Sequence, residues 1–193
     1  GRSIELPEAI FGIEPNEHVI YLAVKQYLAG RRSGTHKTLE KSELSGSTRK
    51  LHKQKGTGGS RKGSIKNPLF KGGARIFGPR PRNYDFKLNK KVKSLAKNSA
   101  LSSKTAGNAI KIVEDFSFSG PKTKEYLKFL QAFGLENKKS LLILPELNEN
   151  VYLSSRNIQG AAIALADSLN TYEIMNNNVI LISEKSIEAI ANS

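Results

Sequence analysis

The spacing of hydrophobic positions predicts a helix near the beginning of the chain. Six hydrophobic residues fall on one stripe at helical spacing, which indicates a helix with one buried face: Val19, Ile20, Ala23, Val24, Tyr27 and Leu28. Asn16 is suited to cap its first turn, and Gly30 is suited to end it. We therefore expect a helix from about residue 17 to about residue 29 that packs against a core.

A second pattern begins near Asn89 and alternates between helices and strands. The helix expected there has one basic face and one packing face, the latter formed by Val92, Leu95, Ala96, Ala100 and Leu101. Short hydrophobic strands follow at 110–113, 140–144, 161–164 and 179–182, and helices are expected over 121–133, 171–175 and 184–191. Strands that alternate with helices favour a parallel sheet flanked by helices, so we expect the α/β fold class.

Residues 31–88 lie between these patterns and keep neither periodicity for more than a few positions. A stretch of this length without regular structure is either functional or disordered. Hydrophobic residues such as Leu51, Phe70 and Phe77 make it unlike a flexible linker. We expect 42–78 to be an extended loop after the first helix. Extended out and back, it reaches about 60 Å at ~3.3 Å per residue, and we expect it to fold on a partner. Residues 1–41 and 79–193 then form the globular domain.

Positive charge is concentrated in the same region of the chain. The net charge is +14, but residues 31–104 hold 21 Lys and Arg against three acids, a net +18, and the remainder has a net −4. Such a segment repels itself unless a polyanion is present. With a nucleic acid it releases condensed counterions and binds with a steep dependence on salt.

Composition and motifs argue against catalysis. There is no cysteine, which excludes disulfides and thiolate metal sites. The nearest phosphate-loop pattern runs from Gly58 to Gly63 but continues with Ser64 and Ile65, where Lys and then Ser or Thr are needed. Nor do the three histidines have metal-ligand spacing. We expect no catalytic residue, metal or other cofactor. No hydrophobic run is long enough to span a bilayer, so we expect a soluble, intracellular protein without a membrane partner.

RNA is the polyanion that this residue pattern favours. Arg and Lys contact phosphates, and guanidinium groups also stack on exposed bases. Glycines allow backbone amides to approach phosphates closely. The sequence shows no helix-turn-helix, zinc finger or heptad repeat that would indicate recognition of duplex DNA.

Several separated blocks resemble a known family, the bacterial form of the universal large-subunit ribosomal protein number four. In the first half they are Arg31-Arg32-Ser33-Gly34-Thr35-His36-Lys37-Thr38, Glu43-Leu44-Ser45-Gly46, Gln54-Lys55-Gly56-Thr57-Gly58, Gly63-Ser64-Ile65, Gly72-Gly73 and Phe77-Gly78-Pro79-Arg80-Pro81-Arg82. In the second half they are Pro121-Lys122-Thr123-Lys124 and Ser155-Arg156-Asn157. The likeness covers nearly the whole chain, with the blocks in the family's order.

The resemblance implies a Rossmann-like α/β domain, whose N-terminal strand is expected to be cut short in this chain, and a loop threaded into the 23S-type rRNA of the large subunit. It implies early assembly, a ribosome-bound location in bacteria or an organelle, and a share in the narrowest part of the peptide exit tunnel. There the partners are the nascent peptide and neighbouring ribosomal proteins, including number twenty-two. The expected tunnel tip comprises His52, Lys53, Gln54, Lys55, Gly56, Thr57, Gly58 and Gly59. The expected rRNA-binding residues are Arg31, Arg32, His36, Lys37, Arg49, Lys50, Lys53, Lys55, Arg61, Lys62, Lys66, Lys71, Arg75, Arg80, Arg82, Lys90 and Lys91.

Three positions depart from the family pattern. The usual Pro-Trp-Arg is here Leu51-His52-Lys53, the usual arginine after Gly-Thr-Gly is Gly59, and a usual third glycine is Ala74. We therefore expect a wider or differently contacted constriction. Two other functions stay open: a free regulatory protein that acts on mRNA or transcription, and an α/β enzyme that also binds RNA.

Overall fold

The computed structural model describes residues 4–192. The chain divides into two compact units. Gly30–Asp85 form one of them, called the basic unit below. The chain before Gly30 and the chain after Asp85 together form the other, called the α/β unit. Both limits of the predicted loop, 42 and 78, fall inside the basic unit.

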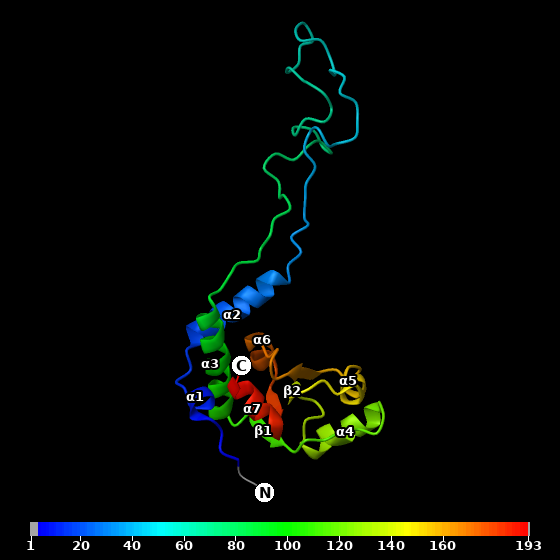
Figure 1. The fold of residues 1–193 in the computed structure, drawn as a ribbon. Helices are drawn as coiled ribbons and strands as arrows, with labels where there is room; N and C mark the ends of the chain where they lie inside the picture. The colour runs from blue at the N-terminus through cyan, green and yellow to red at the C-terminus, as the bar shows by residue number, and fades with distance from the viewer. Residues whose placement is uncertain (1–3, 193) are drawn as a thin grey trace. The chain divides into compact units, whose positions relative to one another are not determined.

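Four parallel strands form the sheet of the α/β unit. They are β1 (Ile110–Val113), β2 (Ser140–Leu144), β3 (Ala161–Leu165) and β4 (Val179–Ser183), and their spatial order is β1-β4-β2-β3. Figure 1 labels β1 and β2. Leu142 in β2 is in register with Ile163 of β3 and with Leu181 of β4. The α/β fold class and all four predicted strands are confirmed.

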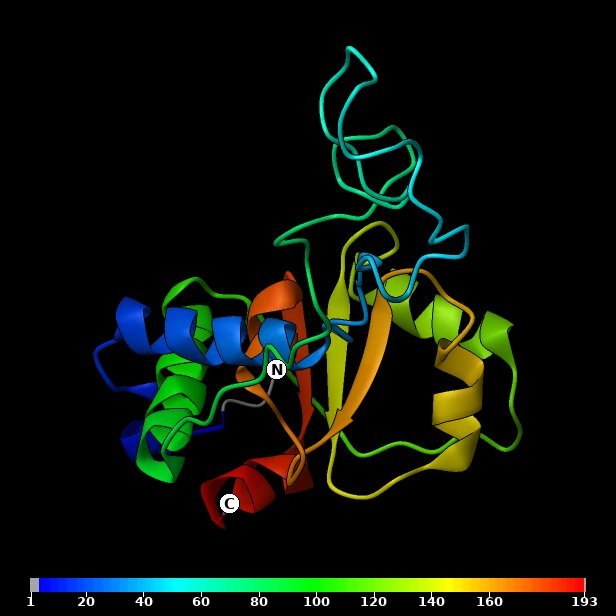
Figure 2. The same ribbon diagram turned by 90° about the horizontal axis from the view of Figure 1, so that it is seen from above.

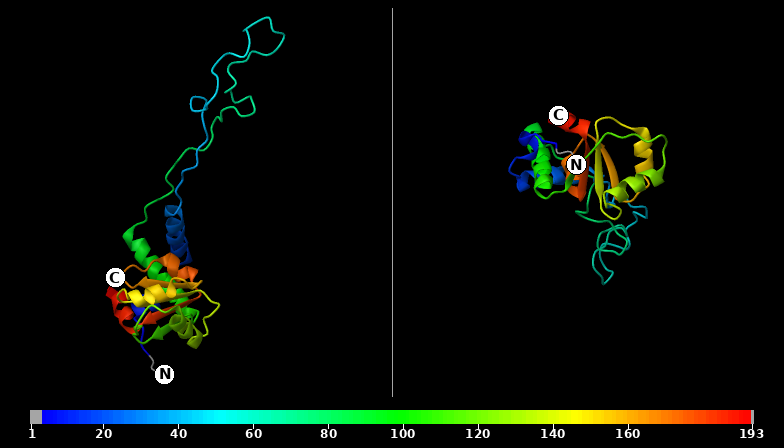
Figure 3. Two further views of the ribbon diagram at one scale, coloured as in Figure 1. Left: turned by 90° about the vertical axis from the view of Figure 1, so that its right-hand side faces the viewer. Right: turned by 90° about the horizontal axis from the view of Figure 1, so that it is seen from below.

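Helices cover both faces of this sheet. They are α1 (Glu8–Phe11), α2 (Glu17–Gly30), α3 (Lys90–Ala106), α4 (Thr123–Ala132), α5 (Glu149–Ser155), α6 (Thr171–Asn176) and α7 (Glu184–Asn192). Figure 2 shows α4 and α5 on one side of the strands and the other helices on the opposite side, and the right-hand view of Figure 3 agrees. The α/β unit therefore has three layers.

The central strand β2 explains why the sheet is covered twice. All five of its residues are buried. Leu142 and Leu144 pack with α4 and α5, whereas Leu141 and Ile143 pack into the cluster shared by α1, α2, α3, α6 and α7. Side chains of a strand alternate between faces, so an uninterrupted hydrophobic run needs a core on each.

Two short helices, α1 and α5, lie outside the predicted set. With four and seven residues, they give too few positions for a helical period to show. The packing face predicted for α3 is also only partly right. Ala96, Ala100 and Leu101 are fully buried, but Leu95 is 42% exposed. Among residues 4–192, no helix is both long enough and apolar enough to cross a membrane.

Candidate nucleic-acid interface

The basic unit has two limbs, residues 34–39 and 75–82, which are joined by backbone hydrogen bonds. The N–H groups of Arg82, Thr38 and Arg75 donate to the carbonyls of Gly34, Pro79 and Leu39 at 3.1, 3.1 and 3.2 Å. Segments 34–39 and 75–82 therefore run side by side, as Figures 1 and 3 both show. Gly34 has φ +61°, and a Cβ there would collide with the Arg82 carbonyl. Only glycine fits this closure without strain.

Tyr84 lies between two of the predicted RNA-binding arginines. The guanidinium carbons of Arg32 and Arg82 are 3.8 and 4.4 Å from the centroid of its ring. Its hydroxyl is 3.3 Å from Nε2 of His36. This cluster, which we call the Tyr84 clamp, thus gathers three predicted site residues around one aromatic ring. Cation–π contact restricts both guanidinium groups, whose N–H edges can still donate to phosphate oxygens.

Two other predicted RNA-binding residues are paired with acids of the same unit. Lys37 forms an ion pair with Glu43, and Arg80 forms one with Glu40. The hydrogen bond from Lys37, followed by that from the Glu40 N–H, lowers the pKa of Glu43. Both pairs are well exposed, and exposed ion pairs contribute little to stability. A phosphate group can therefore replace either carboxylate at low cost.

A compact run of turns separates the limbs from the tip. Its backbone hydrogen bonds include one of 3.0 Å from the Ala74 N–H to the Lys66 carbonyl. Ala74 is buried, and a Cβ on Gly73 would collide with the Asn67 carbonyl. The structure therefore accommodates Ala74 where the family usually has a third glycine, whereas the close backbone contact leaves no room for a side chain at position 73. Lys62 lies over the ring of Phe70, with Nζ 5.9 Å from the centroid.

The predicted tunnel tip is a single closed turn of chain. The Leu51 N–H donates to the Gly63 carbonyl at 3.1 Å, and Nε2 of His52 lies 3.1 Å from the Ser60 carbonyl. Residues 53–59 between these ties are exposed. A Cβ built on Gly59 meets nothing within 4 Å, and Gly59 does not have a positive φ. A side chain at this position would therefore extend freely from the tip.

Large hydrophobic side chains are exposed throughout the basic unit. They are Leu39, Leu51, Ile65, Leu69, Ile76 and Phe77, of which Leu69 is 90% exposed. Phe77 also has a positive φ of 53°, which is uncommon for an aromatic residue. These exposed side chains are available for contact with another molecule. The unit combines these side chains with 15 basic and three acidic residues, a net +12.

Two of the predicted rRNA-binding residues lie outside the basic unit: Lys90 and Lys91, both on α3 of the α/β unit. Lys90 lines a hollow together with Lys93 and Lys97, two lysines that were not among the predicted site residues. Tyr84 was not predicted either. A lone aromatic residue in irregular sequence gives no signal that separates it from a core residue.

The carboxyl edge of the sheet is where an α/β enzyme would bind a ligand. Here it forms a hollow of about 380 Å³ lined by Asp115, Glu146 and Glu149, with Asp115 3.5 Å from Nζ of Lys185. This acidic lining disfavours a nucleotide phosphate. The glycines from Gly58 to Gly63 lie in the basic unit, not in a turn between a strand and a helix. Within residues 4–192, no three His, Asp or Glu side chains gather as metal ligands.

A three-layer α/β unit joined to a basic, glycine-rich unit defines a class of protein suited to a polyanionic partner. The chain belongs to the ribosomal protein L4/L1 family, whose sequence model matches residues 4–193. It is 57% identical to the large ribosomal subunit protein uL4 of Phocaeicola vulgatus over 192 residues, which cover 100% of this chain and 92% of the relative. The uL4 proteins of Bacteroides thetaiotaomicron and Christiangramia forsetii are 55% and 56% identical, and cover 100% and 98% of this chain and 92% and 91% of the relatives.

The predicted family is therefore confirmed. It is a family of ribosomal structural proteins, so the chain is not an enzyme.

Proposed function

We propose that the chain is a structural constituent of the large ribosomal subunit and that its basic unit binds large-subunit rRNA. The observation that carries this proposal is the basic unit itself, with its net charge of +12 and its exposed hydrophobic side chains. The names of the relatives, all large ribosomal subunit proteins of bacteria, identify the assembly in which such a unit acts.

The charges of the basic unit suit an irregular RNA surface. Each cation that meets a phosphate releases counterions, which supplies most of the affinity at low salt. The Tyr84 clamp fixes two guanidinium groups before RNA arrives, which reduces the side-chain entropy lost on binding. The exposed ring of Phe77 is able to stack on an unpaired base, and Leu69 is able to pack beside one. The 17 rRNA-binding residues predicted from the sequence stay a proposal at the level of individual contacts.

The finer proposal concerns the loop over 42–78. We infer that it enters the subunit during early assembly and that its tip, residues 52–59, lines the constriction of the peptide exit tunnel. Its partners there are the nascent peptide and the ribosomal protein number twenty-two. What supports this is the resemblance of the tip sequence and its exposed, closed turn. The chain would then be ribosome-bound in the bacterial cytoplasm.

Gly59 gives the tunnel proposal a specific consequence. Because nothing lies within 4 Å of a Cβ at this position, the missing arginine leaves space that no residue of this chain takes. We expect a wider constriction than in relatives with arginine here. A density map of the assembled tunnel with another side chain in that space would refute this expectation.

Charge-matched variants of the full chain test the rRNA proposal. One variant carries Lys50→Gln, Lys53→Gln and Lys62→Gln in the basic unit, and its control carries Lys124→Gln, Lys128→Gln and Lys138→Gln on exposed positions of the α/β unit. Both lose three charges. Binding to a large-subunit rRNA fragment is measured by fluorescence anisotropy between 50 and 200 mM salt.

The proposal predicts that wild type loses about 10³–10⁵-fold in affinity over this range. The salt slope of the first variant should fall by about 2–3, since each lost phosphate contact removes about 0.7–0.9, while the control keeps the wild-type slope. Equal slopes in the two variants would sink the proposal. Co-sedimentation of the wild type with large subunits separates it from the free regulatory protein, which would stay in the supernatant.

A further inference from the structure

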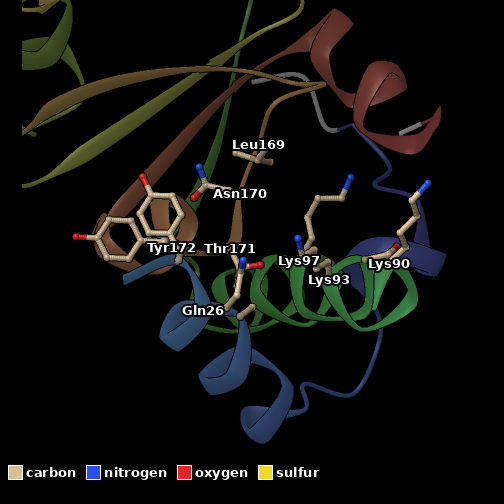
Figure 4. A pocket seen from close by; sticks show the side chains of 11 residues that line it. Gln26, Lys90, Lys93, Lys97, Leu169, Asn170, Thr171 and Tyr172 are labelled. Atoms are coloured by element: carbon tan, nitrogen blue, oxygen red, sulfur yellow. The ribbon is translucent and has the colours of Figure 1, made fainter. Parts of the chain in front are cut away.

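A hollow in the α/β unit lies apart from every predicted contact except that of Lys90. It holds about 440 Å³ between α2, α3 and α6, within the range of about 300–1,000 Å³ that is usual for ligand clefts. Figure 4 shows the labelled lysines along α3 on one side and Asn170 and Tyr172 on the other, with Gln26 of α2 nearby.

One wall of the hollow is strongly basic. Lys90, Lys93 and Lys97 are spaced three and four residues apart, so they share one face of α3. The sequence of α3 itself contains no acidic residue. Partial burial lowers the pKa of Lys97, and the charge of Asp167 acts in the opposite direction. Like charges this close destabilise a helix, and a bound anion would relieve that repulsion.

The opposite wall is aromatic and polar. The rings of Tyr27 and Tyr172 are stacked, with centroids 4.6 Å apart and planes inclined by 19°, and both residues line the hollow. Asn170 also lines it, and its Oδ1 accepts the Glu173 N–H at 2.9 Å. The Asn170 side-chain NH₂ group is therefore the part that is able to donate to a ligand.

We propose that this hollow binds one nucleotide of a single-stranded RNA segment, with the phosphate on the α3 lysines and the base against the tyrosine pair. Cations that follow a backbone beside an aromatic stacking surface are the usual design for unpaired RNA. The site adds a second RNA contact in the α/β unit, and it rests on the proposed RNA binding of the whole chain. The residues that line the hollow all belong to the α/β unit and none to the basic unit.

The test uses the full chain and a labelled ten-nucleotide single-stranded RNA, measured by anisotropy. Tyr172→Leu should weaken binding by roughly 5- to 150-fold, the worth of one stacked base, without changing the salt slope. Lys93→Gln with Lys97→Gln should weaken binding and also lower the slope. The controls are Tyr152→Leu, an exposed tyrosine on α5, and Lys124→Gln with Lys128→Gln, and both should bind as wild type. Tyr172→Phe keeps the ring and should also bind normally.

Photo-cross-linking places the base independently of any effect on folding. RNA that carries 4-thiouridine should cross-link to peptides containing Tyr27 or Tyr172, as identified by mass spectrometry. The proposal is overturned if Tyr172→Leu matches Tyr152→Leu, if the cross-links fall elsewhere, or if free AMP competes as well as the RNA does, which would make the ligand a free nucleotide. These outcomes leave the basic-unit variants untouched, so failure of the hollow and failure of the rRNA proposal are distinguishable.

Discussion

Removal of the ring of Tyr84 is the sharpest test of how the basic unit is organised for RNA. The ring holds Arg32 and Arg82 at 3.8 and 4.4 Å from its centroid. An exposed cation–π contact contributes about 0.5–1 kcal/mol, so the two contacts together stabilise the ordered positions of the two arginines by about 1–2 kcal/mol. In Tyr84→Ala both arginines are mobile, and RNA must immobilise them at a cost of about 0.5–1.5 kcal/mol each.

The smaller of these two quantities limits the effect, because the ring cannot contribute more than its own contacts. The expected loss of affinity is therefore about 1–2 kcal/mol, or roughly 5- to 30-fold in Kd. The salt slope should stay at the wild-type value, since no positive charge has been removed. Arg82→Gln, by contrast, should lower the slope by about 0.7–0.9.

Anisotropy of a labelled rRNA fragment across a salt series measures both quantities. Tyr84→Phe is the matched control, because it keeps the ring and loses only the 3.3 Å contact between the hydroxyl and His36. It should bind within about twofold of wild type. The reasoning fails if Tyr84→Ala binds as tightly as wild type, or if its slope falls as far as that of Arg82→Gln.

Three further predictions concern single groups. Lys37→Met should raise the pKa of Glu43 toward its ordinary value, since the hydrogen bond from Lys37 is the largest cause of its lowering. An NMR titration that shows no change would contradict the ion pair, whose local order is lost as pH falls through the lowered pKa. Burial raises the pKa of Tyr126 to about 12, so stability due to its neutral form is complete below pH 10 and declines above it. Its hydroxyl has no hydrogen-bond partner among the described residues, so Tyr126→Phe should raise the free energy of unfolding by up to about 1–3 kcal/mol. Urea unfolding measured above pH 10 should also lose the part of the decline in stability that is due to Tyr126. The control, Tyr152→Phe, should show neither change. Gly59→Arg should fold as wild type, because the site is open, and should steepen the salt slope by about 0.7–0.9; a lowered Tm would show that the tip is more crowded than its open surroundings indicate.

The hydrophobic pattern was enough to predict the sheet, because the side chains of a strand themselves determine which of its faces must be buried. A run such as 140–144 has no polar residue to face water except Ser140, so it is stable only as a strand covered on both faces. The same logic could not reveal α1 or α5, which are shorter than the window in which a helical period is visible. Only Asn148, whose side chain accepts the Val151 N–H at 3.3 Å, marked the beginning of α5.

The cations of the candidate site could be named from the sequence, but not their organisation. Arg80 and its partner Glu40 are 40 residues apart, and no local pattern connects them. Tyr84 becomes part of the site only because the closure between Gly34 and Arg82 brings Arg32 across from the other limb. The hollow on α3 likewise needs α6, which lies about 75 residues further along the chain. Contacts of this range follow from the fold, not from residue spacing.

The two units differ in what can stabilise them, and this difference bears on how the protein acts. Within residues 30–85, all of which the structure describes, Ala74 is the single buried hydrophobic residue, and the net charge is +12. Burial therefore contributes little to the order of the basic unit, and self-repulsion opposes it. The rest of the chain has 16 basic and 14 acidic residues and contains the two hydrophobic clusters. The α/β unit should consequently fold with little dependence on salt. Outside the limbs that the Tyr84 clamp joins, the basic unit should gain most of its order from RNA. Its protection from proteolysis there should be lost at the salt concentration at which binding is lost.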